Sequence, residues 1–187
     1  MKILRADDHK RMPWKNGGGE TVEIAVFPDQ ACLDDFGWRI SMATVATDGP
    51  FSAFPGVDRT LSILSGAGME LDIAGHHPIV LDGETEPHFF YADLETSARL
   101  IGGPITDLNV MTRRTVFGHT VERRRGPSSI SSAPGHRLLL CMTGKLTIDS
   151  DCQEVVLEPL DALFLEPGEA ASVTGNERFF LVTIDRV

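Results

Sequence analysis

Short runs in which polar and apolar residues alternate constrain this chain more than any other feature. Residues 20–27 and 38–45 both alternate with period two, which is typical of half-buried strands. Further short runs follow up to residue 184, separated by turns rich in Gly, Pro, Asp and Ser. No segment shows ten residues of helical periodicity. Many short strands at regular spacing predict an all-β sandwich or barrel.

The second half of the chain repeats the pattern of the first. Leu61–Gly66 reads Leu-Ser-Ile-Leu-Ser-Gly, and Leu139–Gly144 reads Leu-Leu-Cys-Met-Thr-Gly. A Val-Leu pair and then a strand containing Phe follow in both halves: Val80-Leu81 with Phe89, and Val156-Leu157 with Phe164. A duplicated unit of this size predicts two jelly-roll barrels fused in one chain. We expect them to span residues 1–125 and 126–187, with strands exchanged between the halves.

Composition and charge exclude several classes of protein. Lys and Arg number 17 against 27 Asp and Glu, a net charge of −10, so binding to a nucleic-acid backbone is not expected. No apolar run approaches the ~20 residues that a membrane-spanning helix needs. The first residues contain no apolar segment of the signal-peptide type. Three cysteines without CxxC spacing favour reduced thiols, so we expect a cytoplasmic protein without a membrane partner.

A glycine-rich stretch interrupts the first strands. Trp14-Lys15-Asn16 precedes three consecutive glycines, Gly17 to Gly19, and Glu20 follows them. Successive N–H groups in such a stretch can converge on an anion or a carboxylate. The same glycines can instead serve only to let two strands cross closely. The sequence leaves both interpretations open.

Two groups of motifs resemble known families. Leu160–Gly168, an acidic residue leading into a strand that ends in Pro-x-Gly, resembles the second cupin motif. A more specific set, in its order and spacing, is similar to the HutD/Ves family, and it consists of Trp14–Gly19, Trp38–Ser41, Asp48–Ser52, Phe54–Arg59 and Asp107–Met111. The resemblance is strong from about Ile3 to Arg114 and diffuse beyond.

This resemblance implies a bicupin fold, two fused cupin-like barrels, in a bacterial cytoplasmic protein. HutD members are associated with histidine utilisation, the route through urocanate and formylglutamate to glutamate. Binding of a pathway intermediate as a regulatory signal is the usual proposal for them, whereas Ves-type members are linked to stress responses. The sequence leaves open which of the two roles applies.

The positions at which many cupins bind a metal carry few suitable ligands. The first-half strand reads Asp58-Arg59-Thr60-Leu61, without histidine, and its counterpart offers only His136. No histidine follows Pro167-Gly168. Because a stable site needs three or four ligands of suitable type, we predict no metal and no other cofactor.

Polar residues on the period-two faces are the candidate ligand-binding residues. Arg39 and Ser41 share a face that meets either solvent or a cavity, and an arginine fork binds a carboxylate bidentately. The alternative is that these residues pair with their neighbours or lie on a wet face. The full set of predicted ligand-binding residues is Trp14, Lys15, Asn16, Gly18, Gly19, Glu20, Arg39, Ser41, Asp58, Arg59, Asp107, Asn109 and Met111.

These residues predict a metal-independent protein that binds a small carboxylate or imidazole ligand, such as formylglutamate or urocanate, and so senses or regulates histidine breakdown. Arg39 or Arg59 would bind the ligand carboxylate, and Asn109 would orient it. The alternative is a metal-independent isomerase or hydrolase, with Glu20 or Asp58 as base. No triad or other catalytic arrangement stands out. An adaptor for a protein partner is a third hypothesis, and formation of a homodimer stays open.

Overall fold

The computed structural model describes residues 1–14, 17–150 and 153–187. Two of the predicted site residues, Lys15 and Asn16, lie outside these ranges. The chain divides into two compact units. We call Lys10–Gly118 the N-terminal unit, and Met1–His9 together with His119–Val187 the C-terminal unit.

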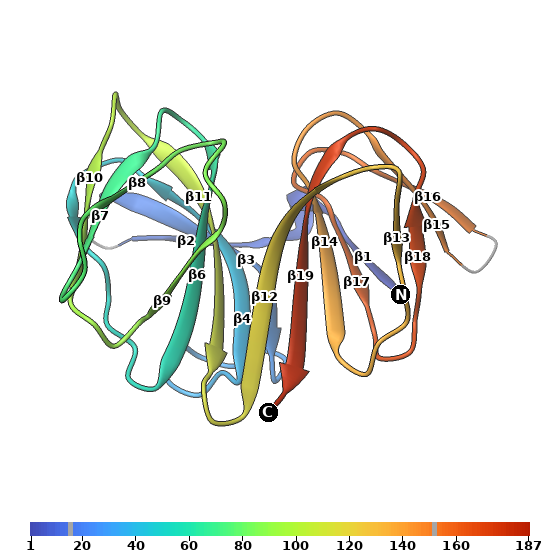
Figure 1. Ribbon diagram of the computed structural model, residues 1–187, viewed down its shortest axis with the longest axis horizontal. Helices are drawn as coiled ribbons and strands as arrows, with labels where there is room; N and C mark the ends of the chain where they lie inside the picture. Colours follow the sequence, from blue (N-terminus) through green and yellow to red (C-terminus); the bar gives the residue numbers. More distant parts are fainter. Residues whose placement is uncertain (15–16, 151–152) are drawn as a thin grey trace. The chain divides into compact units, whose positions relative to one another are not determined.

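The N-terminal unit contains two antiparallel sheets (Figure 1). The six-stranded sheet has the order β2-β3-β4-β11-β6-β9, with the bounds Lys10–Pro13, Gly19–Phe27, Trp38–Val45, Ile105–Arg113, Val57–Ser65 and His88–Tyr91. The four-stranded sheet has the order β5-β10-β7-β8, with the bounds Gly49–Pro50, Thr96–Leu100, Met69–Ile73 and Ile79–Leu81.

Apolar side chains from both sheets form the core of the N-terminal unit. Leu61 and Ile63 of β6 meet Leu71 and Ile73 of β7 in one cluster of buried residues. Successive side chains of a strand point to opposite faces, so the same alternation that predicts these strands also selects the residues facing the opposite sheet. In β4 the residues on this inner face are Arg39, Ser41, Ala43 and Val45, whereas the apolar Trp38, Ile40 and Met42 are buried on the other face of the sheet.

The C-terminal unit is built in the same way. Its five-stranded sheet has the order β1-β17-β14-β19-β12, with the bounds Lys2–Leu4, Ala162–Leu165, His136–Cys141, Arg178–Arg186 and Phe117–Arg125. Its four-stranded sheet has the order β13-β18-β15-β16, with the bounds Ser128–Ile130, Ala171–Val173, Leu146–Ser150 and Gln153–Leu157. A short 3₁₀ helix, η1 (Ala6–Asp8), follows β1. Leu139, Leu163, Leu181 and their neighbours fill the core between the two sheets.

The predicted repeat has a structural counterpart in the pairing of the strands. In the N-terminal unit, β6 pairs with β11 so that Arg59 is opposite Met111 and Leu61 is opposite Asn109. In the C-terminal unit, β14 pairs with β19 so that Arg137 is opposite Thr183, and Leu139 is opposite Leu181. The repeated segments thus occupy equivalent places in the two units.

The prediction of an all-β, cupin-like fold is confirmed, although the hydrogen-bonded sheets of the described residues do not close into barrels. The unit limits differ from the predicted division at residue 125, because β1 pairs with β17 and β12 joins the sheet of β19. Among the described residues, no helix has the length and apolarity needed to cross a membrane.

Candidate functional site

The inner face of the six-stranded sheet carries a group of polar residues in neighbouring rows. Arg39 and Arg59 flank Met111 on the two sides of β11. Ser41 pairs with Asn109 in the next row, and Ala43 pairs with Asp107 in the row after that. Strands lie ~4.8 Å apart, so the two arginines start about 10 Å from each other and both can reach the space above Met111.

Arg59 is the centre of a buried chain of hydrogen bonds. Its Nε donates to Oδ1 of Asn109 at 2.8 Å, and its Nη2 donates to the same oxygen. The amide nitrogen of Asn109 in turn donates to Oδ1 of Asp107. Arg59 is 8% exposed and Asp107 is 0% exposed, so water solvates neither charge well. The ring of Phe51 lies 4.3 Å from the guanidinium carbon of Arg59, and that of Phe90 lies 5.7 Å from it, as in cation–π contacts.

Arg39 forms an ion pair on the same face. Its Nε donates to Oε2 of Glu23 at 2.7 Å, and both side chains are largely buried. Within the described part of the chain, neither terminal nitrogen of Arg39 forms a hydrogen bond. Oδ2 of Asp107 is likewise buried without a partner among the described residues. In the part of the chain that the structure describes, the inner face therefore carries donors without partners on Arg39 and, two rows further along β11, an acceptor without a partner on Asp107.

Burial shifts the pKa values of two residues of this face, Asp107 and Arg59. It raises the pKa of Asp107 to about 7, and the positive charge of Arg59 opposes this shift only in part. Burial also lowers the pKa of Arg59 to about 10, so its guanidinium stays protonated at neutral pH. Buried charges lose hydration, and an apolar replacement is often at least as stable. Shifted groups of this kind gather at functional sites more often than elsewhere.

Seven of the predicted residues lie in this group or pack against it. Arg39, Ser41, Arg59, Asp107, Asn109 and Met111 share the inner face, and Trp14 packs against its core. Three residues that the sequence analysis did not select also belong here: Glu23, Phe51 and Phe90. Glu23 belongs to the alternating run of β3, and it pairs with Ser41, so the register of β3 against β4 is the signal that places it on the inner face. Phe51 belongs to the Asp48–Ser52 motif, but it follows a two-residue strand whose pairing the sequence does not show.

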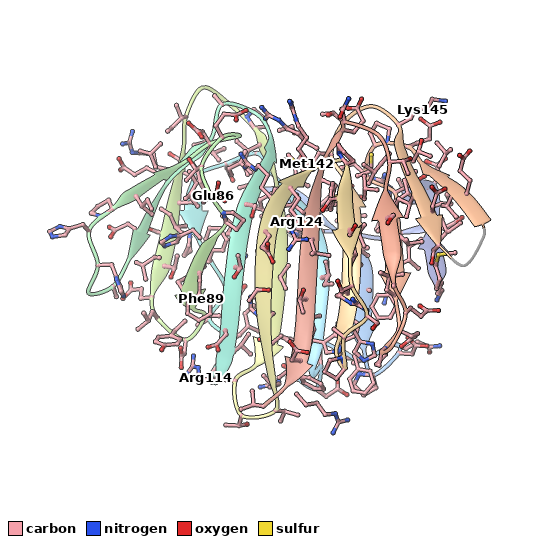
Figure 2. The ribbon with its side chains drawn as sticks, turned by 45° about the vertical axis from the view of Figure 1, so that its right-hand side comes forward. Glu86, Phe89, Arg114, Arg124, Met142 and Lys145 are labelled. Atoms are coloured by element: carbon pink, nitrogen blue, oxygen red, sulfur yellow. The ribbon has the colours of Figure 1, made fainter. Side chains whose placement is uncertain are left out.

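Two predicted residues, Asp58 and Glu20, lie on the other face of the sheet. Asp58 is opposite Thr112 in the register, and its carboxylate accepts a hydrogen bond from Arg114, labelled in Figure 2, at 2.6 Å. Glu20 pairs with Arg11 at 3.0 Å. Because side chains alternate along a strand, neither carboxylate reaches the inner group. Neither of them is therefore placed to act as a base there.

The glycines of this stretch lead into β3. The N–H of Gly17 donates to the carbonyl of Trp14, and the carbonyl of Gly18 accepts from Ala46. A Cβ added at Gly19 would lie 2.1 Å from the carbonyl oxygen of Thr44 and 3.0 Å from the ring of Trp14. At Gly19 the structure thus agrees with close strand crossing, and the indole N–H of Trp14 donates to Thr21.

No group of three or more His, Cys, Asp or Glu side chains suited to a metal occurs among the described residues. The inner group contains two carboxylates, Glu23 and Asp107, both already facing arginine or amide donors. Its donor set suits an organic anion better than a divalent cation, which prefers several oxygen or nitrogen ligands.

Comparison with known families agrees with this architecture. The HutD family model matches residues 6–182. The chain belongs to the HutD family. An uncharacterised 21.2 kDa protein from the hutC 3′ region of Pseudomonas putida is 32% identical over 98% of this chain and 97% of its own length. Protein Ves of Citrobacter koseri is 40% identical over 57% of this chain and 56% of its own length.

Solved structures show the same fold. HutD from Pseudomonas fluorescens SBW25, in a formate condition, has a TM-score of 0.86 and 31% identity, covering 100% of this chain and 98% of that chain. A cupin 2 conserved barrel domain protein from Leptotrichia buccalis has a TM-score of 0.61 and 13% identity, covering 89% and 88%. The second likeness concerns the fold alone.

Proposed function

We propose that the N-terminal unit binds a small carboxylic acid of histidine breakdown, such as formylglutamate or urocanate, on the inner face of its six-stranded sheet. The observation that carries this proposal is that the terminal nitrogens of Arg39, which lies across Met111 from Arg59, form no hydrogen bond among the described residues, and that Oδ2 of Asp107 on the same face has no partner there either. Occupancy of the site would report the level of the pathway acid, which makes the protein a sensor or regulator.

The chemistry of both acids suits this arrangement. A ligand carboxylate accepts two hydrogen bonds from the terminal nitrogens of Arg39, in the bidentate geometry that favours arginine over lysine. Arg59, held by Asn109 and by the ring of Phe51, adds a second positive charge. Formylglutamate has an amide N–H and urocanate has an imidazole N–H, and either group would donate to Oδ2 of Asp107. This binding uses side chains and needs no metal.

Calorimetric titration with urocanate, formylglutamate, formiminoglutamate and histidine tests the proposal. We expect micromolar binding of at least one acid, about −8 kcal/mol. Arg39→Ala and Arg59→Lys should each weaken that binding at least tenfold, which is ~1.4 kcal/mol. Arg99→Ala is the matched control, because Arg99 pairs with Glu70 on the exposed side of the four-stranded sheet. No binding of any of the four acids, or equal losses in the Arg99 control, would overturn the proposal.

A second function, catalysis without a metal, is favoured by one observation. Burial raises the pKa of Asp107 to about 7, which is suitable for a group that accepts and returns a proton near neutral pH. Asp107 would then replace Glu20 and Asp58 as the candidate base. Product analysis of each titrated sample distinguishes the two functions: turnover that is lost in Asp107→Asn supports an isomerase or hydrolase, and unchanged ligand supports a binding protein.

A further inference from the structure

Arg137 is a buried arginine in the C-terminal unit that no part of the proposed function uses. It is 3% exposed and lies on β14, opposite Thr183 of β19 and Leu165 of β17. Its place in the register equals that of Arg59, which is opposite Met111 of β11 and Phe90 of β9. The two arginines are therefore counterparts in the repeat.

The surroundings of the two arginines differ in one decisive respect. β11 provides Asn109 and Asp107 as acceptors on the inner face beside Arg59. At the matching positions of β19, the C-terminal unit has Leu181 and Phe179, which belong to its apolar core. The C-terminal unit thus keeps the guanidinium and lacks the side chains that accept its hydrogen bonds in the N-terminal unit.

The donors of Arg137 remain largely without partners. Its Nη2 donates to the backbone carbonyl of Glu169. Its Nε and Nη1 are buried and have no hydrogen-bond partner among the described residues. A buried donor without an acceptor is strongly unfavourable, and a guanidinium keeps its proton even there. An acceptor from outside the chain would remove this penalty.

The neighbouring carboxylates do not fill this role. Glu169 accepts at Oε1 from the amino group of Met1 and at Oε2 from the N–H of Glu166. Asp185 is exposed, and it acts on Arg137 through its charge, which opposes the lowering of the pKa of Arg137 by burial. Among the described residues, neither carboxylate group forms a hydrogen bond with the guanidinium, so Nε and Nη1 of Arg137 have no acceptor within this part of the chain.

We infer that Arg137 forms a second carboxylate site, in the C-terminal unit, which binds a small monocarboxylate the size of acetate through the unpartnered guanidinium donors. The apolar neighbours Leu165 and Leu181 favour a small organic anion over a strongly hydrated one. Thr183, half-buried on the same face and opposite Arg137, places a hydroxyl group in the adjoining position of β19. This inference does not depend on the proposed function, because it concerns the other unit.

Nuclear magnetic resonance of the arginine side chains tests the inference directly. The Nε–H signal of Arg137, assigned with Arg137→Lys, should shift saturably when acetate replaces chloride at constant ionic strength. About 50 mM acetate suffices, since a site with a Kd of ~1 mM is then nearly full. The same shift should persist in Arg59→Lys, which disables the proposed site of the N-terminal unit. Loss of the Arg137 shift in Arg59→Lys would overturn the inference.

Leu181→Asn is the sharper variant, because it gives Arg137 the acceptor that Asn109 gives Arg59. It should weaken acetate binding at Arg137 at least tenfold, whereas the apolar control Leu181→Met should leave it unchanged. This pair retains Arg137, so it also decides the matter if Arg137→Lys does not fold. An Arg137 signal that acetate does not shift saturably would mean that water alone satisfies the donors, and the inference would be wrong.

Discussion

The two units have the same strand pairing, but matching positions on their inner faces carry polar side chains in one unit and apolar side chains in the other. In the N-terminal unit, the inner face of the large sheet carries Arg39, Arg59 and Asp107. In the C-terminal unit, the matching face carries Leu139, Leu181 and Phe179, with Arg137 as its buried charge. A fold of this kind therefore does not require a polar interior. The C-terminal unit shows that apolar side chains are sufficient to pack this fold. The buried charges of the N-terminal unit therefore lower its stability without being needed for the fold.

The largest effect is expected from placing the polar pattern in the apolar unit. Phe179→Asp puts a carboxylate at the counterpart of Asp107, without the Arg59–Asn109 chain that surrounds Asp107. Loss of the buried ring and desolvation of the charge should together cost more than about 5 kcal/mol, enough to unfold most domains. Urea denaturation followed by circular dichroism measures this loss. Phe179→Leu is the control and should cost roughly 1–3 kcal/mol. A loss below ~2 kcal/mol in Phe179→Asp would show that the two interiors are interchangeable.

The next effect concerns the buried ion pair of the polar unit. Arg39→Ala leaves Glu23 buried and unpaired, and should lower the free energy of unfolding by about 3 kcal/mol. The double variant Arg39→Met with Glu23→Met removes both charges and should differ from the wild type by less than about 1.5 kcal/mol. The same urea experiment compares the two. If the double variant were as unstable as Arg39→Ala, the pair itself would stabilise the fold, and its retention would need no functional reason.

The pH dependence of stability tests the environment of Asp107. Its pKa is 3.8 in the reference state and about 7 in the folded protein, so between these values the folded state binds more protons than the unfolded state. Stability should therefore fall as the pH rises through this window, by at most about 1.4 kcal/mol per pH unit. Asp107→Asn should flatten that part of the profile. Urea midpoints measured from pH 4 to pH 8 give the slope, and identical slopes in both proteins would contradict the assignment.

The smallest effect is expected at Asp58, the aspartate on the other face of the same sheet. Its partner Arg114 is partly exposed, so Asp58→Asn should change the free energy of unfolding by less than about 1 kcal/mol. It should also leave the affinity for the pathway acid unchanged, whereas Asp107→Asn should weaken it. Calorimetry on the two variants side by side provides the measurement. Equal losses of affinity in the two variants would show that Asp58 takes part in ligand binding after all.

Some features of the site follow from sequence patterns, because the period-two alternation of a strand fixes which residues share a face. Alternation predicts that Arg39 and Ser41 share a face, and the structure places both on the inner face together with Asp107 and Asn109. The same reasoning does not place Asp58 and Arg59, since neighbours on a strand point to opposite faces and only one of them can point inward. The register decides that it is Arg59.

The sequence by itself determined the all-β class, the repeat and the membership of the family, because these depend on local alternation and on motif order. It did not determine the unit limits, because the pairing of Lys2–Leu4 with β17 joins residues at opposite ends of the chain. The sequence also did not determine which side chains the buried arginines contact. The contacts of Arg59 with Phe51, and of Arg39 with Glu23, depend on strand register and on a loop, and only tertiary packing sets both. That packing likewise leaves Nε and Nη1 of Arg137 without acceptors among the described residues, although Arg137 occupies the place in the repeat that Arg59 has in the N-terminal unit.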